Sequence, residues 1–253
     1  MKKDRTRNHQ HPDSSDAVEL RRSNIQQNWF LQNIYNEWHA KLVAKIPTGS
    51  QPVLEIGANG PQYKDTLTGL ITSDIVYAPS LDIVLDGQCL PFSSESLRGI
   101  VMTDVLHHLP SVRHFFSEAE RCLIPEGKIV MVEPWLTPWS RLIYGLLHHE
   151  PCEPARRDWE FESNGPMSGA NIALPWIAFK RDRLLFEKEF PKLRIVGLEL
   201  DMPFIYLLSG GVSRKSLFPF KNYGFWRGFE LRLRRWINCC AMFAQITIIK
   251  RCE

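Results

Sequence analysis

The sequence of 253 residues lacks the features that mark several classes of protein. No apolar run approaches the roughly 18–20 residues that a membrane-spanning helix needs, and the charged start MKKDRTRNHQHPDSSD has no apolar stretch typical of a secretory signal. Internal repeats and low-complexity tracts are also missing, which argues against solenoids and fibrous proteins. We therefore expect a cytoplasmic globular protein, with residues 1–18 as a disordered tail and residues 19–253 as a single domain.

The six cysteines include no C-x-x-C pair. This spacing favours neither a disulfide framework nor a cysteine-rich metal site, and it fits a reducing compartment. Two adjacent histidine pairs are present, at His107-His108 and His148-His149. Neighbouring side chains seldom point at one ion, and no third ligand follows at a suitable spacing, so we expect no bound metal.

The net charge is negative before residue 211 and positive from there to the end. Residues 211–253 carry nine Lys or Arg against two acidic residues, whereas the rest of the chain has 22 against 26. At helical spacing the segment 223–237, YGFWRGFELRLRRWI, places its apolar residues on one face: Phe225, Phe229, Leu233, Trp236 and Ile237. We expect this face to pack on the sheet. The alternative is peripheral contact with the inner face of the membrane, and we expect no nucleic-acid partner.

Short apolar strands alternate with turns and helices along most of the chain. The pattern predicts a helix that starts at a capping box, Ser23-x-x-Gln26, and ends before Pro47, and a second helix over 111–123. The strands that it predicts are 52–57, 69–76, 81–85, 99–103, 128–133, 194–200 and 241–250. This rhythm is typical of an α/β, doubly wound, Rossmann-like and mostly parallel seven-stranded sheet with helices on both faces. Residues 134–190 break the rhythm, and we interpret them as an inserted lid.

Chemistry-bearing residues follow the first three strands. Gly57 ends the first strand in GANG, a turn that lets backbone approach a ligand closely. Asp74 ends the second strand, where a carboxylate can accept both hydroxyls of a ribose, and Asp86 follows the third, where it can accept from an adenine amino group. A nicotinamide cofactor is disfavoured because the turn lacks the third glycine of G-x-G-x-x-G.

These stretches resemble the class I S-adenosylmethionine-dependent methyltransferases, in particular the small-molecule, type 11-like branch. The resemblance is carried by VLEIGANG (53–60), TSD (72–74), DGQCLPF (86–92), IVMTDVLHHLP (100–110) and SEAERCLIPEGKIVMVEPW (117–135). The stretches TPWSRLIYGLLHHEP (137–151) and GPMSGANIALPW (165–176) look like bacterial methyltransferases of unassigned substrate.

The resemblance implies S-adenosylmethionine as cofactor and assigns residues to it. Glu55 and Gly57 would line its methionine part, and Asp74 and Asp86 would hold the ribose and the adenine amino group. The further residues implied are Leu90 beside the adenine ring, and Thr103 and Asp104 at the sulfonium end. The family usually has glycine where Asn59 stands, and Asn59 is the next residue best able to adopt that turn geometry.

We expect methyl transfer to oxygen or nitrogen of a small-molecule or lipid-like acceptor. His149, or failing that His108, would remove the acceptor's proton, since imidazole titrates near neutral pH. The acceptor itself would contact His107, His148, Asn171 and Trp176. Histidines bonded to backbone at a helix start are the alternative for the first pair. The alternative function is a non-catalytic binding or accessory protein that retains the methyltransferase fold.

Overall fold

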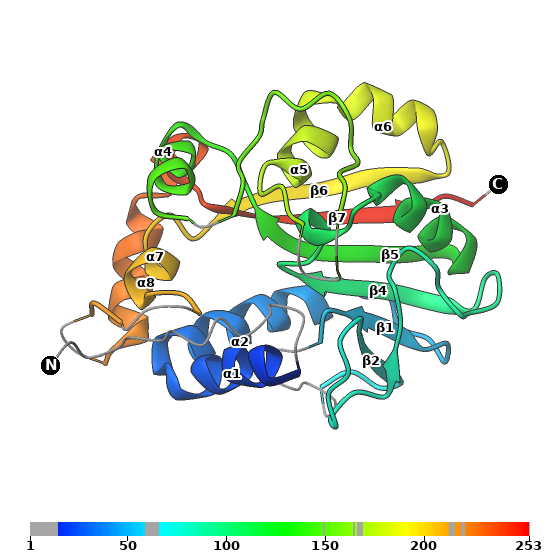
Figure 1. Ribbon diagram of the computed structural model, residues 1–253, viewed down its shortest axis with the longest axis horizontal. Helices are drawn as coiled ribbons and strands as arrows, with labels where there is room; N and C mark the ends of the chain where they lie inside the picture. The colour runs from blue at the N-terminus through cyan, green and yellow to red at the C-terminus, as the bar shows by residue number, and fades with distance from the viewer. Residues whose placement is uncertain are drawn as a thin grey trace, which may run out of the picture.

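A computed structural model shows how these segments are arranged (Figure 1). It describes residues 15–58, 66–148, 150–163, 165, 169–212, 216–218 and 221–252. Most of the predicted tail lies outside these ranges, and the first described helix, α1, begins at Ser15. Asn59 and His149 also lie outside them.

The described chain opens with two helices, which are followed by four strands and then by a mixture of helices and strands. The strands are β1 (Val53–Ile56), β2 (Leu70–Asp74), β3 (Ile83–Val84), β4 (Leu97–Thr103), β5 (Leu123–Pro134), β6 (Leu193–Asp201) and β7 (Phe243–Lys250). The helices are α1 (Ser15–Gln27), α2 (Trp29–Val43), α3 (Val112–Cys122), α4 (Pro138–Leu147), α5 (Leu174–Trp176), α6 (Arg183–Glu189), α7 (Ile205–Ser209), α8 (Tyr223–Arg232) and α9 (Ile237–Cys240). Two 3₁₀ turns, η1 (Leu106–His108) and η3 (Arg234–Trp236), and a π-helical turn, η2 (Ile177–Arg181), complete the list.

The strands form one sheet in the order β3-β2-β1-β4-β5-β7-β6. The first five strands pair in parallel, whereas β7 runs antiparallel to both β5 and β6. The seven-stranded α/β architecture predicted from the sequence is confirmed, but the sheet is mixed, because β7 returns between β5 and β6. Strand order reverses beside β1, so the turns after β1 and β4 meet at the switch point where open α/β sheets bind ligands.

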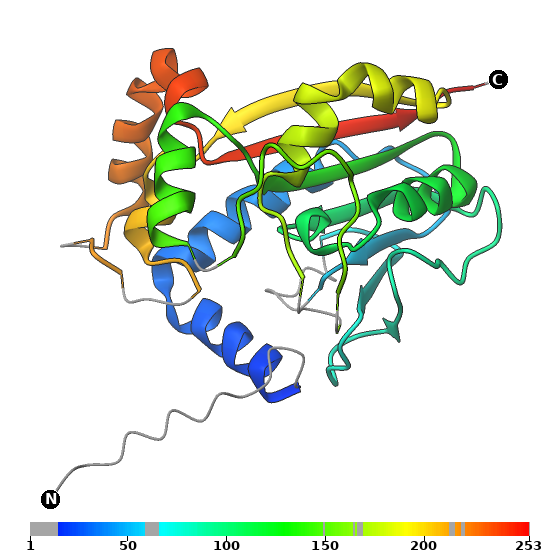
Figure 2. The ribbon, with the colours of Figure 1, turned by 45° about the horizontal axis from the view of Figure 1, so that its top comes forward.

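Helices cover both faces of the sheet (Figure 2). Helix α2 packs on one face through Trp38, which contacts Phe243 of β7 with ring centroids 4.8 Å apart. Helix α3 covers the other face, and its fully buried Phe116 packs against Phe186 of α6. The apolar stripe predicted over 111–123 is therefore the core face of α3.

The single helix predicted from Ser23 is instead two helices. Asn28 separates α1 from α2, and its side-chain oxygen accepts the backbone N–H of Leu31 at 3.1 Å. Ser23 lies inside α1 and accepts a hydrogen bond from Gln27. The capping-box assignment was wrong because Asn28 is an equally good N-cap residue, five positions further on.

Part of the segment 134–190 lies beside the turn that follows β4, while α6 packs against α3 on one face of the sheet. Asn171 donates its backbone N–H to the carbonyl of His107 at 2.9 Å, and Phe161 donates to Pro110 at 3.0 Å. Trp159 is fully buried and donates its indole N–H to Asp182. The insertion is thus bonded to the turn after β4. Among the described helices, none combines the length and the apolar character needed to cross a bilayer.

Candidate active site

Three carboxylates lie at or beyond the carboxyl ends of adjacent strands. Glu55 is the penultimate residue of β1, Asp74 is the final residue of β2, and Asp86 lies two residues beyond β3. Because β3, β2 and β1 are consecutive and parallel, these residues share one edge of the sheet. The three residues thus lie at one edge of the sheet, and their binding to ribose and adenine stays a prediction.

Gly57 makes the turn after β1 possible. Its φ is +78°, a conformation that glycine adopts at no steric cost. A Cβ at this position would lie 2.2 Å from Cγ2 of Val105, in the turn after β4. Glycine is therefore required both by backbone geometry and by space. The contact also brings the predicted cofactor turn directly against the segment that carries the histidine pair.

The other residues predicted to bind the cofactor lie at or near the ends of strands or in the turns that follow them. The Asp74 carboxylate accepts the backbone N–H of Val76 at 2.9 Å, and Asp86 accepts that of Gln88 at 2.8 Å. Leu90 is buried. Thr103 ends β4, and Asp104 follows it with a positive φ of 63°. The protein also shields Glu55 from water, and this raises the pKa of its carboxyl to about 7.

Glu133, near the end of β5, organises the turn after β4. Its fully buried carboxylate accepts the backbone N–H groups of Val105 at 2.9 Å and Leu106 at 2.7 Å through one oxygen. The other oxygen is 2.9 Å from Nδ1 of His107, which is itself buried. A buried carboxylate is stable when it is fully hydrogen-bonded, as here. Glu133 thereby orients the His107 ring so that Nε2 points away from the sheet.

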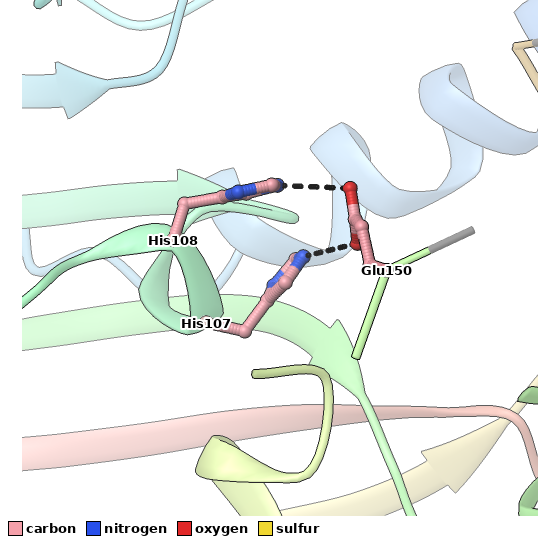
Figure 3. A group of neighbouring side chains, drawn as sticks. All are labelled: His107, His108 and Glu150. Carbon is pink, nitrogen blue, oxygen red and sulfur yellow. Dashed lines mark ion pairs between the residues drawn. The ribbon is translucent and has the colours of Figure 1, made fainter. Parts of the chain in front are cut away.

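Glu150 faces both histidines from the insertion (Figure 3). One of its oxygens lies 3.5 Å from Nε2 of His107, and the other lies 3.6 Å from Nε2 of His108. Nδ1 of His148 is 3.8 Å from the same carboxylate, and Asp104 is 4.0 Å from Nε2 of His107. Several sequence-predicted residues, from two distant segments, therefore meet around one acidic side chain.

Electrostatics couples this cluster. Burial opposes a charge on His107, but the hydrogen bond to Glu133 and the nearby carboxylate of Glu150 outweigh burial and hold the pKa of His107 well above its usual range. Burial likewise opposes ionisation of Glu150. The neighbouring His107 outweighs it, with help from His108 and His148, so the pKa of Glu150 is well below its usual range. A buried carboxylate among imidazoles is stable as an anion beside cations.

The predicted acceptor contacts Asn171, Trp176 and His148 also have partners within the protein. The buried side chain of Asn171 is bonded within the insertion, where its oxygen accepts the N–H groups of Glu153 and Ala173. Its role in the structure is to fix the insertion onto His107. Trp176 of α5 is partly buried against the core. His148 stacks edge-on against Tyr144 at 5.8 Å.

Sequence reasoning missed the roles of Glu133 and Glu150. Glu133 ends an otherwise apolar strand, KIVMVE, and a lone acidic residue at the carboxyl end of a buried strand is a signal that could have been used. Glu150 follows a histidine pair, but nothing in its neighbourhood along the chain indicates that it faces the other pair. The fold of the insertion alone brings it there.

Comparisons with known proteins concern the domain and the fold. The family model described as a methyltransferase domain matches residues 72–131, which run from β2 into β5. No curated protein matches the chain in sequence.

Solved structures share the fold over nearly the whole chain. A chain from the complex between the Haloferax volcanii Trm112 methyltransferase activator and a methyltransferase is 12% identical, with a TM-score of 0.51, covering 96% of this chain and 98% of that chain. The geranyl diphosphate C-methyltransferase from Streptomyces coelicolor A3(2) is 13% identical, with a TM-score of 0.50, covering 95% and 86%. Residues 72–131 thus match a methyltransferase domain, and the chain as a whole shares its fold with these two structures.

Proposed function

We propose that the chain binds S-adenosylmethionine and transfers its methyl group to a small-molecule or lipid-like acceptor. The observation that carries this proposal is the row of carboxylates Glu55, Asp74 and Asp86 at the ends of three adjacent strands, beside the turn at Gly57. A carboxylate can accept two ribose hydroxyls or an exocyclic amine, and a glycine turn admits a ligand close to the backbone.

The sulfonium of this cofactor is already activated, so the protein has to align donor and acceptor and to exclude water. The insertion supports that role, because it is bonded to the turn after β4 through Asn171 and Phe161. Its placement beside that turn fits a lid on the acceptor side. The histidines and Glu150 would then line the acceptor's position.

An oxygen or nitrogen acceptor with a high pKa needs a group that helps to remove its proton. His108 fits this role better than His107, because its side chain is 15% exposed and that of His107 is 1% exposed. His149, the first choice from the sequence, lies outside the described residues. Loss of such a base typically lowers the rate by about 10²–10⁴.

A lipid-like acceptor is favoured by the surface of α8 and η3. Phe225, Phe229 and Trp236 are each more than half exposed. They lie beside the exposed Arg232, Arg234 and Arg235. Aromatic residues next to arginines suit an anionic membrane surface, from which an amphiphilic acceptor could be taken.

Calorimetric titration with S-adenosylmethionine tests the cofactor site. The variant Asp74→Asn keeps the oxygen that accepts from Val76 but removes the charge. We expect it to bind the cofactor about ten- to hundredfold more weakly, since a hydrogen bond to a charged group contributes about 1.5–3 kcal/mol. Asp158→Asn, an exposed aspartate of the insertion, is the matched control and should bind like the wild type.

The same titration separates the alternative function. A non-catalytic protein that merely retained the fold would bind neither S-adenosylmethionine nor S-adenosylhomocysteine measurably, and Asp74→Asn would then change nothing. Binding of both cofactors combined with no turnover in a broad acceptor screen would favour an accessory role. Turnover of any hydroxyl- or amine-bearing acceptor would support the enzyme.

A further inference from the structure

His107, His108 and Glu150 offer three ligand atoms that lie within 4.8 Å of one another. The histidines come from η1, after β4, and the carboxylate comes from the insertion (Figure 3). Two imidazoles and one carboxylate form a ligand set that divalent transition metals bind, with coordination positions left open.

The spacing of these atoms fits a shared ion better than direct hydrogen bonds. The nitrogen–oxygen distances of 3.5 and 3.6 Å exceed the roughly 2.7–2.9 Å of a charged N–H···O bond. Two ligands that each lie about 2.1 Å from a tetrahedral ion are separated by roughly 3.4 Å. Both observed distances are within a few tenths of an ångström of that separation.

Glu133 supplies the outer support that such a site requires. Metal-binding histidines usually donate their second ring N–H to a carboxylate, which fixes the tautomer and the ring orientation. Here Nδ1 of His107 is 2.9 Å from the buried Glu133 carboxylate, so Nε2 is the atom presented to Glu150. Nδ1 of His108 faces the carbonyl of Gly169 at 3.4 Å, which again leaves Nε2 for the ion.

We propose that His107, His108 and Glu150 bind a divalent transition-metal ion of the zinc class. The sequence argument against a metal assumed that no third ligand was close, and Glu150 supplies that ligand through the fold. Asp104 lies 4.0 Å from Nε2 of His107, the nitrogen that faces Glu150. Metal binding is a property of the chain alone and goes beyond the proposed transfer reaction.

The ion would also define the acceptor, a consequence that rests on the proposed function. An open coordination position takes a hydroxyl oxygen, and the ion lowers the pKa of that hydroxyl. The O–H bond then breaks, and the proton passes to water rather than to His108, which does not act as the base while its Nε2 binds the ion. The oxygen forms its bond to the methyl carbon as the carbon–sulfur bond of the cofactor breaks, and sulfur keeps the electron pair. A hydroxylated acceptor is therefore favoured over an amine.

Zinc titration of the full chain, without cofactor or acceptor, tests the proposal. His9 and His11 near the N-terminus are replaced by asparagine in every protein used, so that these histidines do not contribute. We expect one zinc ion per chain, and His108→Asn and Glu150→Gln should each weaken zinc binding at least about tenfold. His114→Asn, which replaces an exposed histidine of α3, is the control and should not change the affinity.

Folding and cofactor binding are checked in parallel, because Glu150 and His108 are partly buried. Each variant should unfold in one cooperative thermal transition and keep its affinity for S-adenosylmethionine, although Glu150→Gln lowers the thermal midpoint because it removes the charged partner of His107. Wild-type zinc binding well below one ion per chain would overturn the proposal, as would equal loss of affinity in His114→Asn. Either result would leave the cofactor titration unaffected, so the two proposals can fail independently. A Co²⁺ derivative whose visible spectrum changes with Glu150→Gln would support the site directly.

Discussion

At the scale of single residues, Gly57 packs against Val105 across the switch point of the sheet. Since a Cβ at Gly57 would lie 2.2 Å from the Val105 side chain, the two turns are packed without space to spare. Glu133 holds the second turn through the N–H groups of Val105 and Leu106. The predicted cofactor turn and the histidine cluster are thus held in one rigid arrangement, as in-line transfer requires.

Glu55 leads to a prediction about pH. Its pKa is raised to about 7, so in the free protein it is neutral below that pH and ionised above it. The ionised form should bind the positively charged methionine end of the cofactor better. We expect S-adenosylmethionine affinity, relative to that of Glu55→Gln, to rise about tenfold between pH 6 and pH 8. Calorimetric titration at several pH values measures this ratio.

The Glu55→Gln variant is needed because the cofactor's own amino group titrates in the same range. Any pH dependence of the affinity that remains in this variant belongs to the ligand or to other groups of the protein. If the ratio of the two affinities did not change with pH, Glu55 would not contact the charged part of the cofactor.

Residues at strand ends could be predicted from the sequence, whereas residues that meet through the fold could not. Glu55, Asp74 and Asp86 each follow a recognisable apolar strand, and the parallel sheet then places them together. Glu150 approaches His108 only because the insertion turns back to the turn that follows β4, and its sequence contains no periodicity from which that path could be inferred. The position of each strand along the chain can be read from its own residues, whereas the path of the insertion depends on contacts between distant residues.

At the scale of elements, a buried guanidinium joins α8 to α2 and β6. Arg227 donates to Glu37 at 2.6 Å, to Asp201 at 2.7 Å and to Glu230 at 2.6 Å. Glu230 in turn accepts the N–H groups of Phe204 and Ile205 at the start of α7. Helix α8 is therefore joined to α2 and β6 through charged side chains, while its Phe225 and Phe229 are more than half exposed. The packing of its apolar face on the sheet, expected from the sequence, was wrong for Phe225, Phe229 and Trp236.

Helical periodicity could not predict the burial of Arg227. Arg227 lies off the apolar face by helical periodicity, and such residues are normally exposed. Its burial depends on Glu37 and Asp201, which are far away along the chain. Three carboxylates supply enough partners for a buried guanidinium, which an isolated helix could not.

Acid unfolding tests this junction. Burial alone would raise the pKa of Glu37, but Arg227, Lys41 and Tyr223 lower it to about 2. A lowered pKa stabilises the fold above the unfolded value of 4.5, and this stabilisation is lost as the pH falls from about 4.5 towards 2. We expect Glu37→Gln to lower the free energy of unfolding at pH 7 by about 3 kcal/mol, and by much less at pH 3.

Urea unfolding at the two pH values measures both effects. Glu199→Gln is the matched control, because Glu199 pairs with Lys45 at the surface and is 63% exposed. An exposed pair of this kind contributes less than about 1 kcal/mol. A loss in Glu37→Gln no larger than that of the control, or a loss that did not shrink at low pH, would contradict the role given to Glu37.

At the scale of the whole molecule, the positions of the strands and of the basic residues can be read from the sequence, whereas the direction of β7 and the exposure of side chains cannot. The seven strands and α3 could be predicted because each is a short apolar run with turn residues at its ends. The antiparallel direction of β7 does not follow from such runs, since it depends on how the long connection after β6 returns. The basic final segment could be read directly from the sequence, but only the fold shows that its aromatic residues are exposed.

Vesicle binding tests what this exposed surface does. Residues Phe225 and Phe229 lie one helical turn apart on α8, and both are more than half exposed. Because each basic residue near an anionic membrane contributes about 1 kcal/mol, the arginines at 232, 234 and 235 together contribute roughly 3 kcal/mol. We expect the protein to sediment with phosphatidylserine-containing vesicles at low salt, and to remain in solution with neutral vesicles or at high salt.

Replacing those three arginines with glutamine should weaken vesicle binding by about a hundredfold, in line with the loss of roughly 3 kcal/mol. The matched control replaces three exposed basic residues elsewhere, Lys188, Arg194 and Arg251, with glutamine and removes the same charge. If net charge alone drove binding, both triple variants would lose it equally. Specific loss in the first variant would place the membrane at α8 and η3, whereas equal loss, or no binding by the wild type, would leave the exposed aromatic residues without a lipid partner. An amphiphilic acceptor would then lose its strongest support, because nothing else in the described structure connects this site to a membrane.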